Sequence, residues 1–88
     1  MHAKYEFVEV FEEGGEPVAK VNRLAPGWIF GFWKFDTKTF DEKTCRDVLE
    51  DARRERGTNS VGAEYADHNE REMIKALNAI EQWKKFGR

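Results

Sequence analysis

The segment "GWIFGFWKFD", residues 27–36, concentrates bulky apolar side chains and so limits how this chain can fold. Its five aromatic residues are Trp28, Phe30, Phe32, Trp33 and Phe35. A β-strand directs alternate side chains to opposite faces, so an extended segment of this composition is apolar on both faces. Two helices can cover one face of a small sheet, not both. We therefore expect several of these rings to meet water, a partner molecule or a loop that folds back.

Three segments have the alternating pattern of β-strands. The first is Lys4 to Phe11, and the second runs from about Pro17 to Leu24 after a turn at Gly14-Gly15. We expect "APG", residues 25–27, to form another turn and Trp28 to Phe35 to form the third strand. Strict alternation in the first strand places on one face Tyr5, Phe7, Glu9 and Phe11, and on the other Glu6, Val8, Val10 and Glu12. Connections this short predict antiparallel pairing.

The apolar period changes to that of a helix in "FDEKTCRDVLEDARRERG", which begins at Phe40. The apolar stripe of this first helix consists of Cys45, Val48, Leu49 and Ala52. Asp41 is the predicted N-cap, and Phe40 before it is placed to pack on Cys45. Gly57 follows three arginines and is predicted to end the helix.

A second helix is predicted near the C-terminal end of the sequence. Its apolar stripe contains Met73, Ile74, Ala76, Leu77, Ile80 and Trp83, with Phe86 as a further candidate. Asp67 or Asn69 could cap its start; alternatively Ser60 caps it and the helix gains Val61 and Tyr65. Without that extension, residues 57–69 form a thirteen-residue connection, which is long for a small domain.

These elements predict a single α+β domain over residues 1–88. The expected fold is a three-stranded antiparallel β-meander followed by two α-helices packed on one face, in the order β-β-β-α-α. The second helix is expected to supply most of the helical contribution to the core.

Charge and cysteine content exclude some classes of function. Fifteen basic and seventeen acidic residues give a net charge of −2, which argues against binding nucleic acid through bulk charge. Cys45 is the only cysteine, so the fold needs no oxidising compartment, and we expect a cytoplasmic protein. No continuous apolar segment is long enough to span a membrane, so no membrane partner is expected.

The residues that usually carry chemistry are few and scattered. Cys45 falls on a predicted buried stripe, and the remaining candidates for nucleophilic catalysis are Ser60, His2 and His68. His68 and Glu72 share a helix face at i, i+4, but a structural metal site needs further ligands. We therefore expect no enzymatic activity, no cofactor, no metal and no small-molecule substrate.

The leading functional hypothesis is a small interaction module that binds a protein partner, or a second copy of itself, through an aromatic-rich sheet surface. Its predicted partner-binding residues are Trp28, Phe30, Phe32, Tyr5 and Phe7. Large aromatic side chains are preferred at interface hot spots because they combine contact area with low rotamer entropy. The simplest version is a symmetric homodimer. The competing structural interpretation is that these rings cap the sheet edge or lie under loops.

The alternative function is nucleic-acid binding, with bases stacked on the sheet aromatics. The predicted contacts to phosphate, or to an acidic partner, are Lys20, Arg23, Lys34, Arg53 and Arg54. The first hairpin also carries several glutamates, which would repel phosphate. The sequence therefore favours a protein partner over nucleic acid.

Overall fold

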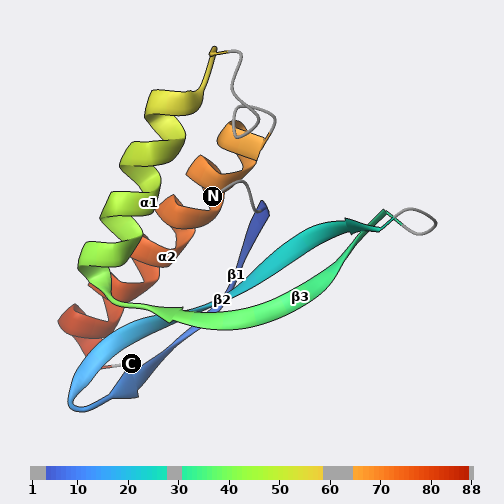
Figure 1. The fold of residues 1–88 in the computed structure, drawn as a ribbon. Coiled ribbons are helices and arrows are strands. Elements are labelled where there is room, and N and C mark those ends of the chain that lie inside the picture. Colours follow the sequence, from blue (N-terminus) through green and yellow to red (C-terminus); the bar gives the residue numbers. More distant parts are fainter. Residues whose placement is uncertain (1–3, 28–30, 59–64, 88) are drawn as a thin grey trace.

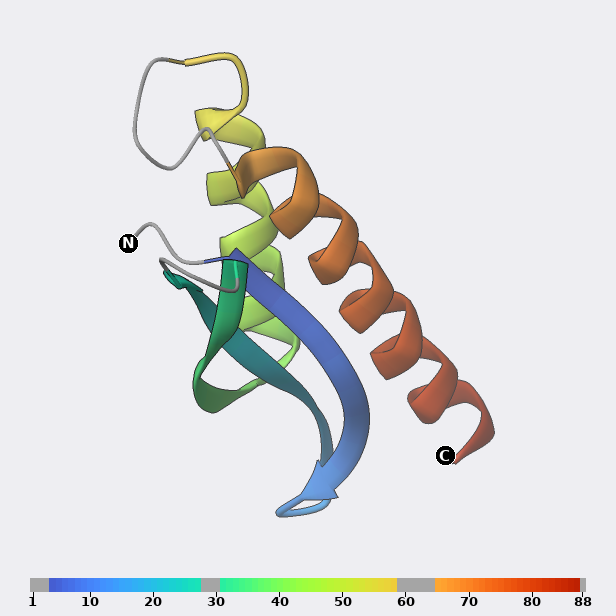
Figure 2. The ribbon, with the colours of Figure 1, turned by 90° about the vertical axis from the view of Figure 1, so that its right-hand side faces the viewer.

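The computed structural model describes residues 4–27, 31–58 and 65–87 and confirms the predicted order of elements (Figure 1). The elements are β1 (Lys4–Glu13), β2 (Glu16–Gly27), β3 (Gly31–Phe40), α1 (Glu42–Glu55) and α2 (Ala66–Phe86). The strands form one antiparallel sheet in the order β1-β2-β3. The two helices run antiparallel to each other on one side of the sheet (Figures 1 and 2). The fold is therefore the expected small α+β fold.

The connection between β2 and β3 differs from the prediction. Residues 25–27 do not form the expected turn: they belong to β2, where Ala25 pairs with Trp33 and Gly27 with Gly31. Pro26 is tolerated because it lies beyond Leu24, the last residue of β2 that pairs with a described residue of β1. β3 starts at Gly31, which has a φ of +80°. The expected start of that strand at residues 28–30 lies outside the described residues.

A β-bulge at Val8 corrects the predicted alternation of β1. The pairing with β2 shifts between Phe7 and Glu9, so Val8 has no partner of its own and is 44% exposed. The extra residue reverses the phase of the strand. Phe7 and Val10 consequently both pack against the core, and Phe11 joins Glu9 on the opposite face. The prediction that Phe7, Glu9 and Phe11 share a face was wrong because period-two reasoning assumes an unbroken ladder.

The core lies between the helices and the first two strands. Its buried cluster consists of Ala19, Val21, Cys45, Leu49, Met73, Ala76 and Ile80. Half-buried side chains that pack against it are Tyr5, Phe7, Val10, Phe40, Val48 and Leu77. Each large aliphatic side chain buried here contributes roughly 1.5–3 kcal/mol. α2 packs mainly on β1 and the adjacent part of β2, whereas α1 touches β2 and β3 sparsely.

The start and end of α1 confirm the sequence prediction. The carboxylate of Asp41 accepts a hydrogen bond from the Thr44 N–H (2.8 Å), and this bond lowers the pKa of Asp41. Phe40 packs against the cluster that contains Cys45, as a hydrophobic staple requires. Gly57, just beyond the helix, has the positive φ of +83° expected of a stop signal.

The start of α2 was predicted incorrectly. The helix begins at Ala66 after Tyr65, whose side chain makes no capping hydrogen bond. Asp67 lies in the first turn, and Asn69 lies inside the helix with its side chain bonded to β1. Ser60 and Val61 lie outside the described residues. In the described part of the chain, no helix is long and apolar enough to cross a membrane.

Candidate functional site

The distal parts of β2 and β3 extend beyond the helices and form what we call the arm, residues 24–27 paired with residues 31–34 (Figure 1). A second register shift, between Arg23 and Leu24, marks the base of the arm. Gly31 and Lys34 are exposed, and Leu24 and Ala25 are half-buried. The radius of gyration of 13.4 Å exceeds the roughly 12 Å typical of a compact chain of this length. The arm therefore contributes to an elongated shape.

The predicted aromatic anchors fall into two groups. Trp28 and Phe30 lie outside the described residues, and of Phe32 the structure describes only its place in β3 opposite Pro26. Tyr5 and Phe7 are half-buried on the helix-covered face. Among the described side chains, the Tyr5 ring makes an edge-on contact with Phe40, with the ring centroids 5.6 Å apart. Burial raises the pKa of Tyr5. Tyr5 and Phe7 therefore lie apart from the open face.

Side chains of α2 bind the backbone of β1, the edge strand nearest to them. The Tyr5 N–H donates to Asn69 Oδ1 (2.8 Å), and the Phe7 N–H donates to Glu72 Oε1 (2.9 Å). His68 Nε2 lies 2.6 Å from the carbonyl oxygen of Tyr5, to which it donates. These three side chains take the place of a neighbouring strand. This half of the β1 edge is therefore closed to further pairing.

This role of α2 was not predicted from the sequence. His68 and Glu72 were candidate metal ligands and Asn69 a candidate cap, but all three bind β1. A usable signal was present, because Asn69 and Glu72 lie on the same helical stripe as Met73 and Ala76. A polar side chain on an apolar stripe must find a buried hydrogen-bond partner. In the described ranges, no group of three metal-binding side chains is found.

Glu72 is ionised although it is buried. Burial alone would raise its pKa, but hydrogen bonds from Lys75 and from the Phe7 N–H outweigh burial, so the pKa is lowered. The Lys75 ammonium lies 2.8 Å from Glu72 Oε2 and leaves Oε1 for the strand. The charge therefore strengthens the bond between α2 and β1.

The middle of the open face of the sheet carries polar side chains. Glu6, Asn22 and Thr37 form a ladder across all three strands. The Asn22 amide donates to Glu6 Oε1 (3.1 Å), and the Thr37 hydroxyl donates to Asn22 Oδ1 (2.8 Å). A shallow groove of about 270 Å³ lies beside it, lined by Glu9, Phe11, Lys20, Thr37 and Thr39. This part of the face offers hydrogen-bonding groups and a single half-buried ring.

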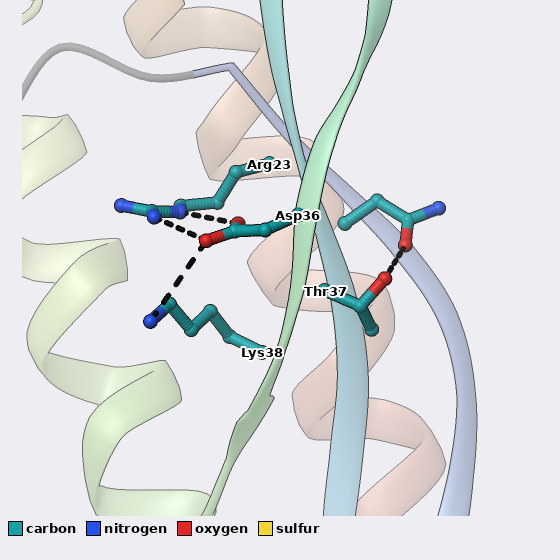
Figure 3. Close-up of polar contacts among 5 residues, drawn as sticks. Arg23, Asp36, Thr37 and Lys38 are labelled. Atoms are coloured by element: carbon teal, nitrogen blue, oxygen red, sulfur yellow. Dashed lines mark hydrogen bonds and ion pairs between the residues drawn. The ribbon is translucent and has the colours of Figure 1, made fainter.

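Arg23, a predicted phosphate contact, lies on the other face of the sheet, away from Thr37 (Figure 3). Asp36 lies beside it on that face and neutralises it. Its Nε donates to Asp36 Oδ1 (2.6 Å), and a second bond joins its terminal nitrogen to Oδ2. Lys38 lies 3.9 Å from the same carboxylate. The bidentate pair raises the pKa of Arg23 and lowers that of Asp36. An arginine held in this way has little remaining capacity for phosphate.

The basic end of α1 is neutralised as well. Arg53 binds Glu70 of α2 (2.9 Å), and Arg54 binds Asp51 one turn earlier. Arg56 also binds Glu70. Of the two remaining predicted cations, Lys20 lies on the open face and Lys34 is exposed on the arm. The five predicted cations therefore do not form one basic patch.

Cys45 is placed as the sequence predicted. The thiol is fully buried in the core cluster, and burial raises its pKa to about 12. It is protonated at neutral pH and so poorly suited to nucleophilic attack. Ser60 and His2 lie outside the described residues, and His68 is bound to β1.

No protein family, curated protein or solved structure matches this chain.

Proposed function

We propose that this chain is a small, non-enzymatic, cytoplasmic interaction module that binds a protein partner, or a second copy of itself, through the aromatic-rich end of the β2–β3 hairpin. Trp28, Phe30 and Phe32 are its anchors. The proposal includes no cofactor, metal, membrane or small-molecule substrate.

The observation that carries this proposal is the position of the arm. The ends of β2 and β3 run past the helices, and the most aromatic stretch of the sequence spans this end of the hairpin (Figure 1). The core cluster is built on β1, the base of β2 and the helices, and none of the described arm side chains belongs to it. Apolar groups on such a projection gain most by burial against another molecule.

The state of the cations favours protein over nucleic acid as the partner. Arg23, Arg53 and Arg54 are each bound to a carboxylate, so releasing them for phosphate would break an ion pair. Binding through aromatic contacts should depend weakly on salt. Binding through phosphates should weaken steeply as salt rises.

A triple substitution, Trp28→Ala, Phe30→Ala and Phe32→Ala, tests the proposal. We expect the free energy of unfolding to fall by less than about 1 kcal/mol, because anchors that serve a partner contribute little to the stability of the free chain. Partner capture from a lysate of the source cells should be lost, both with and without nuclease treatment. Urea denaturation and affinity capture with mass spectrometry measure the two effects.

The matched control is Phe7→Ala, which removes a ring that packs against the core. This substitution should lower the free energy of unfolding by about 2–4 kcal/mol. It should leave partner capture intact at temperatures where the variant is folded. A loss of several kcal/mol in the triple variant would instead show that the arm rings belong to a core.

A further inference from the structure

We infer that the outer edge of β3 pairs antiparallel with β3 of a second copy of this chain, about a two-fold axis at Thr37. This pairing would join two three-stranded sheets into one of six strands. It uses a surface separate from the aromatic anchors and goes beyond the proposed function.

The two edges of the sheet differ in how far the helices cover them. The β1 edge is closed at Tyr5 and Phe7 by side chains of α2. β3 is the other edge strand, and α1 contacts it only sparsely. In the part of the chain that the structure describes, no helix side chain is bonded to the backbone of Thr37 or Thr39. An uncovered strand edge is a template for another strand.

The backbone direction of β3 follows from the bonds of β1. The N–H groups of Tyr5 and Phe7 point away from β2, so their partners Arg23 and Val21 direct their backbone groups to β3. Arg23 pairs with Asp36, and Val21 pairs with Lys38. The residues between and beyond them, Thr37 and Thr39, therefore direct their N–H and C=O groups outward.

A two-fold axis at Thr37 matches both the backbone and the charges. Thr37 then lies opposite Thr37 of the second copy and exchanges two backbone hydrogen bonds with it. Asp36 lies opposite Lys38 of the second copy, and Lys38 lies opposite its Asp36. Asp36 and Lys38 point to the same side of β3, and so would meet across the axis (Figure 3). Opposite charges in directly facing positions stabilise a strand pair.

Other registers lose this match. An axis at Asp36 sets aspartate against aspartate and Lys34 against Lys38, and the backbone of Asp36 faces β2 rather than the outside. The register shift beside Asp36 and the start of α1 at Glu42 limit the regular edge to a few residues. Charges on an edge usually oppose pairing with foreign strands. Here the alternating signs make the edge selective for its own copy.

Substitution of Thr37 separates the backbone from the side chain. Thr37→Pro removes the outward N–H, whereas Thr37→Val keeps it and loses only the hydroxyl. We expect the wild type and Thr37→Val to show about twice the chain mass of 10.3 kDa by light scattering. Thr37→Pro should dimerise at least about tenfold more weakly, because two backbone hydrogen bonds are lost per dimer. Circular dichroism checks that each variant is folded.

A charge exchange tests the pairing independently of Thr37→Pro, and circular dichroism again checks folding because Asp36→Lys removes the partner of Arg23. Asp36→Lys alone and Lys38→Asp alone each place like charges opposite each other and should dimerise more weakly than the wild type. An equal mixture of the two should form heterodimers, because every facing pair is again of opposite sign. Lys85→Asp is the matched control, since it makes the same charge change as Lys38→Asp at an exposed position of α2 and should leave dimerisation unchanged.

Four results would overturn the pairing. Three of them are a wild type that stays monomeric up to about 1 mM, a Thr37→Pro variant that dimerises as well as Thr37→Val, and a charge mixture that associates no better than its components. A dimer lost in the Trp28, Phe30 and Phe32 alanine variant but kept in Thr37→Pro would also overturn it. That last result would support the proposed function, in the form where the arm binds a second copy.

Discussion

At the scale of single residues, the polar side chains on the apolar stripe of α2 determine how the helix joins the sheet. Asn69 and Glu72 are 9% and 6% exposed, and each accepts a hydrogen bond from a backbone N–H of β1. A buried N–H without a partner costs about 1–3 kcal/mol. The two residues therefore fix the register of α2 against β1 as well as satisfying the strand edge.

Replacing Asn69 should show the cost of an unsatisfied strand edge. We expect Asn69→Ala to lower the free energy of unfolding by about 1–3 kcal/mol, because the Tyr5 N–H loses its acceptor in a half-buried position. Urea denaturation followed by circular dichroism measures the change. Asn78→Ala, an exposed position on the same helix, is the control and should change stability by less than about 0.5 kcal/mol.

Glu72 should make stability depend on pH. Its pKa in the folded protein is below the ordinary value of 4.5, so its contribution is fully present above about pH 4.5. The contribution is lost as the pH falls through the lower folded-state pKa, because protonation then favours the unfolded chain. We therefore expect the unfolding free energy of the wild type to fall relative to that of Glu72→Gln when the pH is lowered from 6 to 3. A difference independent of pH would contradict the ionised state.

At the scale of elements, a single inserted residue lets β1 direct its large apolar side chains Phe7 and Val10 to the helix-covered face. Val8 carries no ladder partner, and the bulge directs Phe7 and Val10 to the same face. Strict alternation would place apolar side chains of β1 on both faces of the sheet. The bulge instead turns Phe7 and Val10 to the same face, so no second covered face is needed for them. The sequence shows that β1 has apolar residues at both odd and even positions, but it cannot show which residue is the bulge.

Deleting Val8 should be far more damaging than truncating it. With the bulge removed, either Phe7 or Val10 must turn to the open face, at roughly 1.5–3 kcal/mol for each side chain lost from the core. Val8→Ala should lower the free energy of unfolding by less than about 0.5 kcal/mol because the side chain is exposed and lies outside the core cluster. Urea denaturation compares the two variants, and similar stabilities would contradict the role of the bulge.

At the scale of the whole molecule, the described core cluster is small and lies between the sheet and the two helices. α2 secures β1, while β3 and the arm extend from the edge that the helices cover least. A structure of this kind should open globally to expose its centre, since the buried cluster draws on both helices and on the sheet.

Cys45 reports on this opening because it is fully buried and its pKa is about 12. We expect its reaction with a thiol reagent at pH 8 to be limited by unfolding and to be fast in urea. In Asn69→Ala the native rate should rise about fivefold to a hundredfold, in proportion to the larger unfolded population. Native labelling as fast as in urea would show that the thiol is accessible without unfolding.

The sequence by itself determined the element order and the ends of α1, because hydrophobic period and the cap at Asp41 are local properties. Tertiary structure decided the bulge at Val8, the start of α2 and the bonds of Asn69 and Glu72 to β1, which join residues more than sixty positions apart. It also decided that Arg53 meets Glu70 of α2 rather than a ligand. Local patterns depend on neighbouring residues and so indicate whether a side chain is buried. Long-range packing decides which distant groups that side chain contacts.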